Sequence, residues 1–199
     1  NCFTPIDYPV EAALGTVDFI SEDVYGNKSP NNGSYNSEAV INAYYKLLNC
    51  GFRPGLAAGT DYPCNNNEPL GTLLTYVRVK DQLTYRKWIE GIKNGRTVVS
   101  RNGHNEFIEL KINGRYIPGD EIMLQNNGTV SIEAKWTAIK ELKGIIELVS
   151  NGKVLASQVG TSKPGEPDLL KTTATFSKSG WICARRMDDQ GHQTHTAPV

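Results

Sequence analysis

The stretch Thr129–Thr137, TVSIEAKWT, alternates between apolar and polar side chains. Val130, Ile132, Ala134 and Trp136 would fall on one face of an extended chain, and the polar residues between them on the other. A period of two along the chain is typical of a half-buried antiparallel strand. The stretch therefore predicts a strand whose Trp136 side points into a core.

The chain on both sides of this stretch keeps the same pattern, from residue 102 to residue 199. Three Asn-Gly pairs between apolar runs predict tight turns, because both residues tolerate positive φ. They are Asn113-Gly114, Asn127-Gly128 and Asn151-Gly152. Further strands are expected in GIIELVS, KVLAS, LKTTATF, GWICARR and the final HTAPV. About seven or eight short strands predict a β-sandwich of immunoglobulin-like size over residues 102–199.

Residues 1–101 instead alternate between short apolar strands and amphipathic helices, as in an α/β layer. One helix should end at Gly51, and a second should begin after the N-cap Thr84 and end at Gly95. The expected buried stripes are Val40, Ile41, Tyr44, Leu47 and Leu48 in the first helix and Trp88, Ile89 and Ile92 in the second. Strands near residues 16–20, 55–60 and 73–79 are expected to form a parallel sheet. The predicted fold class is α/β plus β, with a domain boundary between residues 101 and 102.

Composition excludes few functions. The 199 residues are 39% hydrophobic, which is enough for real cores, and Lys plus Arg equals Asp plus Glu at 21 each. With no overall field, neither a nucleic-acid partner nor an anionic membrane is expected, and no apolar run approaches the roughly 20 residues of a membrane helix. The four cysteines follow no metal-binding spacing and are expected to be mostly free thiols, although a Cys50–Cys64 pair stays open. The Asn, Gly and Thr content of the tail strands slightly favours a periplasmic or extracellular location over a cytoplasmic one.

Few side chains suggest chemistry by themselves. Asp61 follows the apolar run GLAA and the step Gly59-Thr60, where a carboxylate can be a metal ligand but more often forms an Asx-turn or a helix cap. Arg101 and Asn102 follow the strand RTVVS and could contact an anionic substrate group, or could simply lie on the surface at a domain junction. His192 and His195 are three apart, but the flanking residues predict turn and strand, where positions i and i+3 point to opposite faces. His104 is expected to be solvated, and the tryptophans to be core residues.

Several segments taken in order resemble the later part of PHP-superfamily metal-dependent hydrolases. They are PVEAALGTVDFI, YYKLLNCGFRPGLAAGTDYPC, LTYRKWIEGIKNGRTVVSRNG, LKINGRYIPGDEI and the closing HTAPV. Within that superfamily the chain is most similar to the carbaryl-hydrolase-type group. The resemblance implies a partial distorted (β/α) barrel followed by the sandwich. It also implies divalent ions (Zn, Mn or Fe) at the carboxyl ends of the barrel strands, with Asp61 as one metal ligand and Arg101 and Asn102 near the substrate.

The departures from this pattern limit what the chain can do alone. The family's early His-x-His motif, its following glutamate and its middle histidines have no counterpart here, and Tyr62-Pro63-Cys64 stands where many members have a histidine. One carboxylate cannot hold a catalytic ion, which needs about three protein ligands. We therefore expect the C-terminal fragment of a phosphoesterase or an amide or carbamate hydrolase, with a small-molecule substrate in the complete form. No catalytic residue, bound metal or activity is expected in this chain alone.

Two further expectations follow from this interpretation. Without the first half of the barrel, one edge of the parallel sheet would be open, so a homo-oligomer could form through the α/β edge. The alternative to the hydrolase is a noncatalytic β-sandwich module for binding or structure, with the α/β segment as an appendage. An exposed row of aromatic side chains would favour that alternative.

Overall fold

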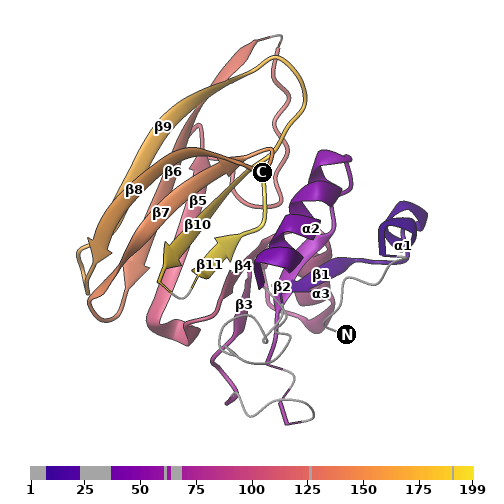
Figure 1. The fold of residues 1–199 in the computed structure, drawn as a ribbon. Helices are drawn as coiled ribbons and strands as arrows, with labels where there is room; N and C mark the ends of the chain where they lie inside the picture. Colours follow the sequence, from indigo (N-terminus) through magenta and orange to yellow (C-terminus); the bar gives the residue numbers. More distant parts are fainter. Residues whose placement is uncertain (1–7, 23–36, 61, 64–68, 126, 190) are drawn as a thin grey trace.

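The part of the chain that the structure describes is mostly β-sheet, with three α-helices and open sheets (Figure 1). This computed structural model describes residues 8–22, 37–60, 62–63, 69–125, 127–189 and 191–199. The helices are α1 (Tyr8–Leu14), α2 (Ser37–Asn49), α3 (Tyr85–Lys93) and the short 3-10 helix η1 (Gly103–Asn105). The strands are β1 (Phe19–Glu22), β2 (Gly55–Ala58), β3 (Leu74–Val77), β4 (Thr97–Ser100), β5 (Glu106–Ile112), β6 (Gly128–Ala138), β7 (Leu142–Ser150), β8 (Lys153–Ser162), β9 (Asp168–Phe176), β10 (Ile182–Asp188) and β11 (Gly191–Thr196).

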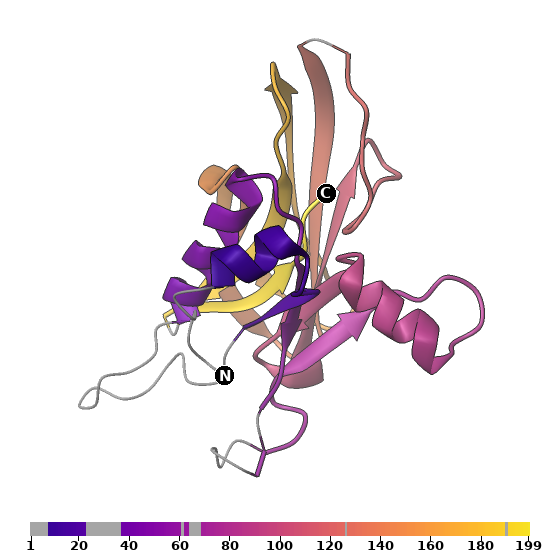
Figure 2. The same ribbon diagram turned by 90° about the vertical axis from the view of Figure 1, so that its right-hand side faces the viewer.

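A six-stranded sheet of order β3-β4-β11-β10-β7-β8 lies at the centre of the described structure. On one face it shares a core with β5, β6 and β9, which form a three-stranded sheet; buried members of this core include Val98, Ile146, Leu110 and Trp136. On the other face it packs against α2, through a core that includes Tyr44 and Cys183. Figure 2 shows α1 and α2 together on one side of the strands. The described chain is thus layered as helix, sheet and sheet.

The six-stranded sheet contains strands from both sides of residue 101. β3 and β4 precede this residue, whereas β11, β10, β7 and β8 follow it, and β11 is the antiparallel neighbour of β4. The expected α/β part and the expected sandwich part therefore contribute strands to one continuous sheet. Val98 and Val99 are consecutive residues in β4, and they point into the two different cores because side chains alternate along a strand.

The predicted parallel sheet is confirmed only for two of its three strands. β1 and β2 pair in parallel, with Phe19 opposite Gly55, and α2 lies between them in the chain. The third strand, β3, pairs antiparallel with β4, so its assignment to the parallel sheet is wrong. β3 instead meets β2 through a side chain: Thr75 Oγ1 accepts from the Ala58 amide at 2.7 Å and donates to the Ala58 carbonyl at 2.9 Å. The Thr75 hydroxyl therefore connects β3 to β2 at a point where the two strands have no backbone pairing.

The alternating strand that opened the sequence analysis is confirmed. Val130, Ile132, Ala134 and Trp136 are all buried in β6, which pairs antiparallel with β5 and β9. The Asn151-Gly152 turn between β7 and β8 is also confirmed, since both residues have positive φ, at 51° and 80°. Such a turn matches the right-handed twist of the strands that it joins.

The helix predictions hold for α2 and only in part for α3. The five residues of the α2 stripe are all buried, and Gly51 follows the helix with a φ of +88°. In α3 the N-cap at Thr84 is confirmed, but Trp88 and Ile89 are 37% and 39% exposed, and only Ile92 of the expected stripe is buried. The helix approaches the strands through its Gly91 side, where an added Cβ would lie 2.4 Å from Val77 Cγ1. The close approach turns the Trp88 face toward solvent.

Candidate functional site

The carboxyl end of β2 is where the sequence predicts a metal ligand. Gly59 and Thr60 continue from β2, and Thr60 is buried. Thr75 fixes the end of the strand through its two hydrogen bonds to Ala58. Asp61 itself lies outside the described residues, so its role as a metal ligand stays a prediction. Cys64, the possible partner of Cys50, also lies outside them, and the Cys50 thiol is exposed.

Arg101 and Asn102 follow β4 as predicted. The Asn102 carboxamide donates to Glu106 Oε1 at 3.1 Å and accepts from Asn105 Nδ2 at 3.1 Å, so it already has protein partners on both sides. The Arg101 amide donates to the Gln193 carbonyl at 2.7 Å and ties this segment to β11. These contacts give Asn102 a structural role next to a buried carboxylate. The substrate role of both residues stays a prediction.

A buried ion pair links the two sheets behind Asn102. Arg186 of β10 donates through Nε to Glu106 Oε2 of β5 at 2.6 Å, and a second guanidinium nitrogen contacts Oε1. Trp136 Nε1 also donates to Glu106 Oε2, at 2.8 Å, and the Arg186 guanidinium lies over the Trp136 ring. The Arg186 and Glu106 side chains are 1% and 0% exposed. A substrate would not reach these groups, which fits a role in holding the sheets together. The sequence analysis did not find this ion pair, because Glu106 is 80 residues away from Arg186.

A second buried polar cluster lies between α2 and the central sheet. Tyr45 Oη lies 2.6 Å from His195 Nε2, and Cys183 Sγ lies 3.6 Å from the same nitrogen. His195 Nδ1 lies 2.7 Å from the Thr196 carbonyl, which can only accept. Nδ1 therefore carries a proton, and the Nε2 of a neutral ring accepts from the Tyr45 hydroxyl.

Cys183 and His195 form a Cys–His pair that the sequence spacing did not reveal. Burial raises the pKa of the Cys183 thiol to about 12, so the sulfur stays protonated at neutral pH. Burial likewise raises the pKa of the Tyr45 hydroxyl well above its usual value. A nucleophilic cysteine needs a thiolate and access to substrate, and Cys183 is fully buried. The cluster is suited to packing and hydrogen bonding rather than to covalent catalysis.

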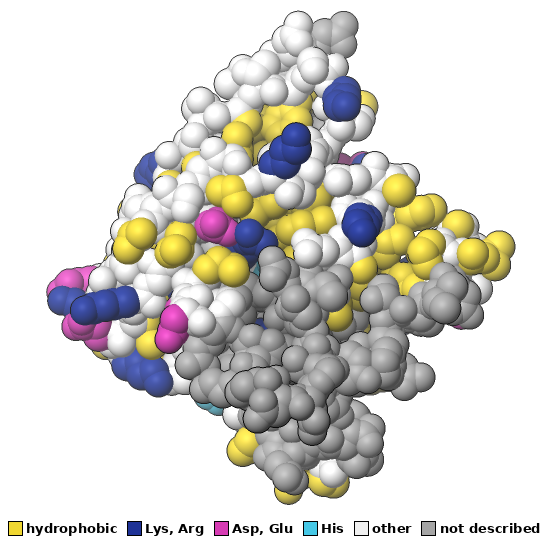
Figure 3. Space-filling model, viewed as in Figure 1, with side chains coloured by type: hydrophobic (Ala, Val, Ile, Leu, Met, Phe, Trp, Pro, Cys, Tyr) yellow, Lys and Arg dark blue, Asp and Glu magenta, His cyan; other side chains and the backbone are white. Residues whose placement is uncertain are grey.

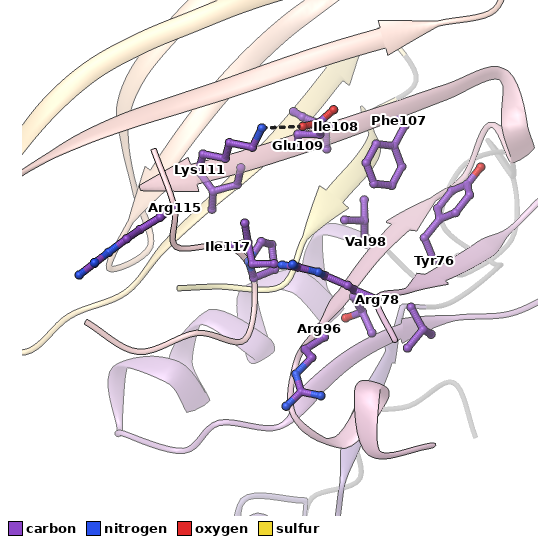
Figure 4. Close-up of a pocket in the computed structure, with 14 residues that line it drawn as sticks. Tyr76, Arg78, Arg96, Val98, Phe107, Ile108, Glu109, Lys111, Arg115 and Ile117 are labelled. Atoms are coloured by element: carbon purple, nitrogen blue, oxygen red, sulfur yellow. Dashed lines mark ion pairs between the residues drawn. The ribbon is translucent and has the colours of Figure 1, made fainter. Parts of the chain in front are cut away.

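A cavity of about 580 Å³ opens between β3 and β4 of the central sheet and β5 of the facing sheet. Figure 4 shows its apolar side chains, among them Val98, Phe107 and Ile117. The rings of Tyr76 and Phe107 meet edge to face, with centroids 5.1 Å apart. The volume lies within the range of small-molecule pockets, about 300 to 1,000 Å³.

Positive charges surround this apolar cavity. Four of its lining residues are cations, Arg78, Arg96, Lys111 and Arg115, and one is a carboxylate, Glu109, which gives a formal charge of 4 − 1 = +3. Glu109 is paired with Lys111 at 3.3 Å and with Lys135 at 3.7 Å. The sequence analysis missed this group of cations because each comes from a different segment and no charge run marks it.

The described residues contain no ready-made metal centre. Among them, no three His, Cys, Asp or Glu side chains come close enough together to hold an ion. His104 is exposed, as predicted, and His192 and His195 both lie in β11, a strand, as expected from the flanking residues. Within the same residues, no helix combines the length and the hydrophobicity needed to cross a membrane.

Comparisons of the chain with protein-family models, with curated proteins and with solved structures found no match. The functional argument therefore depends on the sequence and on the geometry of the described residues.

Proposed function

We propose that this chain is the C-terminal portion of a PHP-type metal-dependent hydrolase that acts, in its complete form, on a phosphoester or on an amide-like or carbamate-like bond. The observation that supports this proposal is the unit β1-α2-β2. It is a parallel strand–helix–strand unit whose second strand leads directly into Gly59, Thr60 and Asp61. In α/β folds, ligands and catalytic groups gather at the carboxyl ends of such strands.

Asp61 would then be one ligand of a divalent ion such as Zn, Mn or Fe. The described residues do not supply the remaining ligands, and a catalytic ion needs about three from the protein. The described residues therefore do not fit a complete metal site, and no reaction step is derived through one. The chain alone, with its partial barrel, is expected to be inactive, and the small-molecule substrate belongs to the complete form.

The test uses a polypeptide that extends upstream of Asn1 in the gene. If that extension contains a His-x-His segment, Asp61→Ala should lower the bound divalent metal and the hydrolysis of model phosphoesters and carbamates by orders of magnitude. Metal content is measured by elemental analysis. Asp18→Ala is the matched control, because Asp18 precedes β1 at the opposite end of the same two-stranded sheet and is exposed. Equal metal content in the two variants would remove Asp61 from the site.

The second candidate function is a noncatalytic binding or structural module. Trp136 and Trp181 are 0% and 7% exposed, so they do not form the exposed aromatic platform that would favour glycan binding. The observation that does favour a binding function is the basic cavity beside β5. The cavity is separate from the predicted metal site, because none of its residues comes from β1 or β2, or from the segment that follows β2.

A further inference from the structure

We propose that the cavity between β4 and β5 binds a small organic anion that has an apolar body, with Arg78 contacting its anionic group. This site differs from the predicted metal site, and its residues come from two sheets that face each other. The inference depends on three features of the cavity: its apolar interior, its excess of cations, and the lack of a carboxylate partner for three of these cations among the described residues.

The interior suits an apolar group. Val98 and Ile108 are buried and belong to the core between the sheets, and Tyr76 and Phe107 pack against that core. Tyr76 and Phe107 are half-buried, and covering their remaining exposed surface with an apolar ligand is favourable by about 25 cal/mol per Å². A fully hydrated anion, such as free phosphate, would make no use of this surface.

The cations suit a negative charge. Arg78, Arg96 and Arg115 have no ion-pair partner among the described residues, whereas Lys111 is paired with Glu109. Arg115 lies over the Tyr116 ring, 4.4 Å from its centroid. The protein as a whole has a formal net charge of zero, so the cations at the cavity are a local concentration of charge. A guanidinium binds carboxylates and phosphates through two parallel hydrogen bonds.

The arrangement singles out Arg78 among these cations. In Figure 4 its side chain extends toward Ile117 alongside the apolar residues, whereas Arg96 and Arg115 point outward from the group. Arg78 follows β3 directly, and its amide donates to the Arg96 carbonyl at 2.9 Å, so its backbone is fixed at the end of the β3–β4 pair. An anion beside the apolar wall would meet Arg78 first, and the other cations would add a longer-range attraction that salt weakens.

Calorimetric titration of the 199-residue chain tests this inference with three ligands that share one ring system. Naphthylacetate and naphthyl phosphate carry an anion, and naphthylethanol is the neutral counterpart. We expect both anions to bind at least about 10-fold more tightly than the alcohol, because a charge-assisted hydrogen bond contributes that much. The tighter of the two anions identifies the preferred group, carboxylate or phosphate.

Two variants then test whether Arg78 is the cation that contacts the anionic group. Arg78→Gln should remove the preference for the anions and leave the affinity for naphthylethanol unchanged. Arg86→Gln should change neither affinity, because Arg86 lies on α3 outside the cavity and is exposed. Ligand-induced shifts of the methyl resonances of Val98, Ile108 and Ile117 locate the binding site by NMR. The inference fails if no ligand binds, if the alcohol binds as tightly as the anions, if Arg78→Gln retains the preference, or if the shifts lie elsewhere.

Discussion

Glu106 is a residue at which several buried polar contacts converge, one of them to the facing sheet. It accepts from Arg186 of β10, from Trp136 of β6 and from Asn102, and it is buried together with Arg186. Glu106→Gln keeps the shape of the side chain but removes its charge, which leaves Asp188 as the one counter-ion of Arg186 among the described residues. We expect the free energy of unfolding to fall by about 3 kcal/mol or more, because a buried charge loses its main partner. Urea unfolding followed by circular dichroism measures this loss.

The matched control for this substitution is Glu90→Gln on α3. Glu90 pairs with Arg86 on an exposed helix face, at 3.0 Å, and such pairs contribute roughly 0.5 kcal/mol or less. If both variants lost the same small amount of stability, the contacts of Glu106 would not stabilise the fold. A double variant, Glu106→Gln with Arg186→Met, should recover part of the loss, because it removes the unpaired buried charge as well.

These residue-scale contacts lay beyond what the sequence could predict. Glu106 and Arg186 are 80 positions apart, and Tyr45 and His195 are 150 apart, so no spacing rule brings either pair together. The cavity, too, is formed by residues that lie far apart in the sequence. Its four cations occupy positions 78, 96, 111 and 115, and only the pairing of β3 with β4 and the facing of β5 bring them to one place. Single residues next to a predicted strand, such as Arg101 and Asn102, could be identified, but their partners could not.

At the scale of elements, α3 depends on its first turn. Thr84 Oγ1 accepts from the Lys87 amide at 3.2 Å, and this satisfies one of the amides that the start of a helix leaves unpaired. Thr84→Ala should therefore lower the free energy of unfolding by about 1 kcal/mol. Thermal unfolding measures the change. Thr84→Ser is the matched control, since it keeps the hydroxyl, and a loss as large as that of Thr84→Ala would rule out the cap as the cause.

The elements that the sequence predicted best are those whose own periodicity decides them. The α2 stripe, ending before Gly51, and the alternation of Val130 to Trp136 in β6 both describe faces that are buried in the structure. The partner of a strand is a different question, because hydrogen bonding between strands depends on the rest of the fold. The sequence predicts a strand at β3 whatever its partner, and only the structure shows it antiparallel to β4. Likewise, the helical spacing predicts that Trp88 faces inward. In the structure the Gly91 side of α3 packs on β3 instead, and Trp88 is partly exposed.

At the scale of the whole molecule, the two-stranded sheet β1-β2 is the least protected part of the described fold. β1 pairs only with β2 among the described strands, so its other edge has no strand partner there. Phe19 in β1 is 45% exposed, and Val10 and Leu14 in the neighbouring α1 are 59% and 72% exposed. Figure 3 shows hydrophobic side chains gathered over the α1 side of this face. An open strand edge next to exposed apolar side chains favours pairing with another chain.

We therefore expect the 199-residue chain to self-associate through β1, and Phe19→Lys to reduce this association. A lysine on an edge strand opposes pairing, because bringing two copies together would bury its charge. Analytical ultracentrifugation over a range of protein concentrations measures the change in sedimentation.

Val159→Lys is the matched control. Val159 is 81% exposed in β8, the strand at the far edge of the six-stranded sheet, so its replacement tests a different edge with the same change in charge. A monomeric parent chain would contradict the expectation, and association that only Val159→Lys abolishes would move the interface to β8. Association lost with Phe19→Lys and kept with Val159→Lys would identify β1 as the edge at which the chain meets its neighbour.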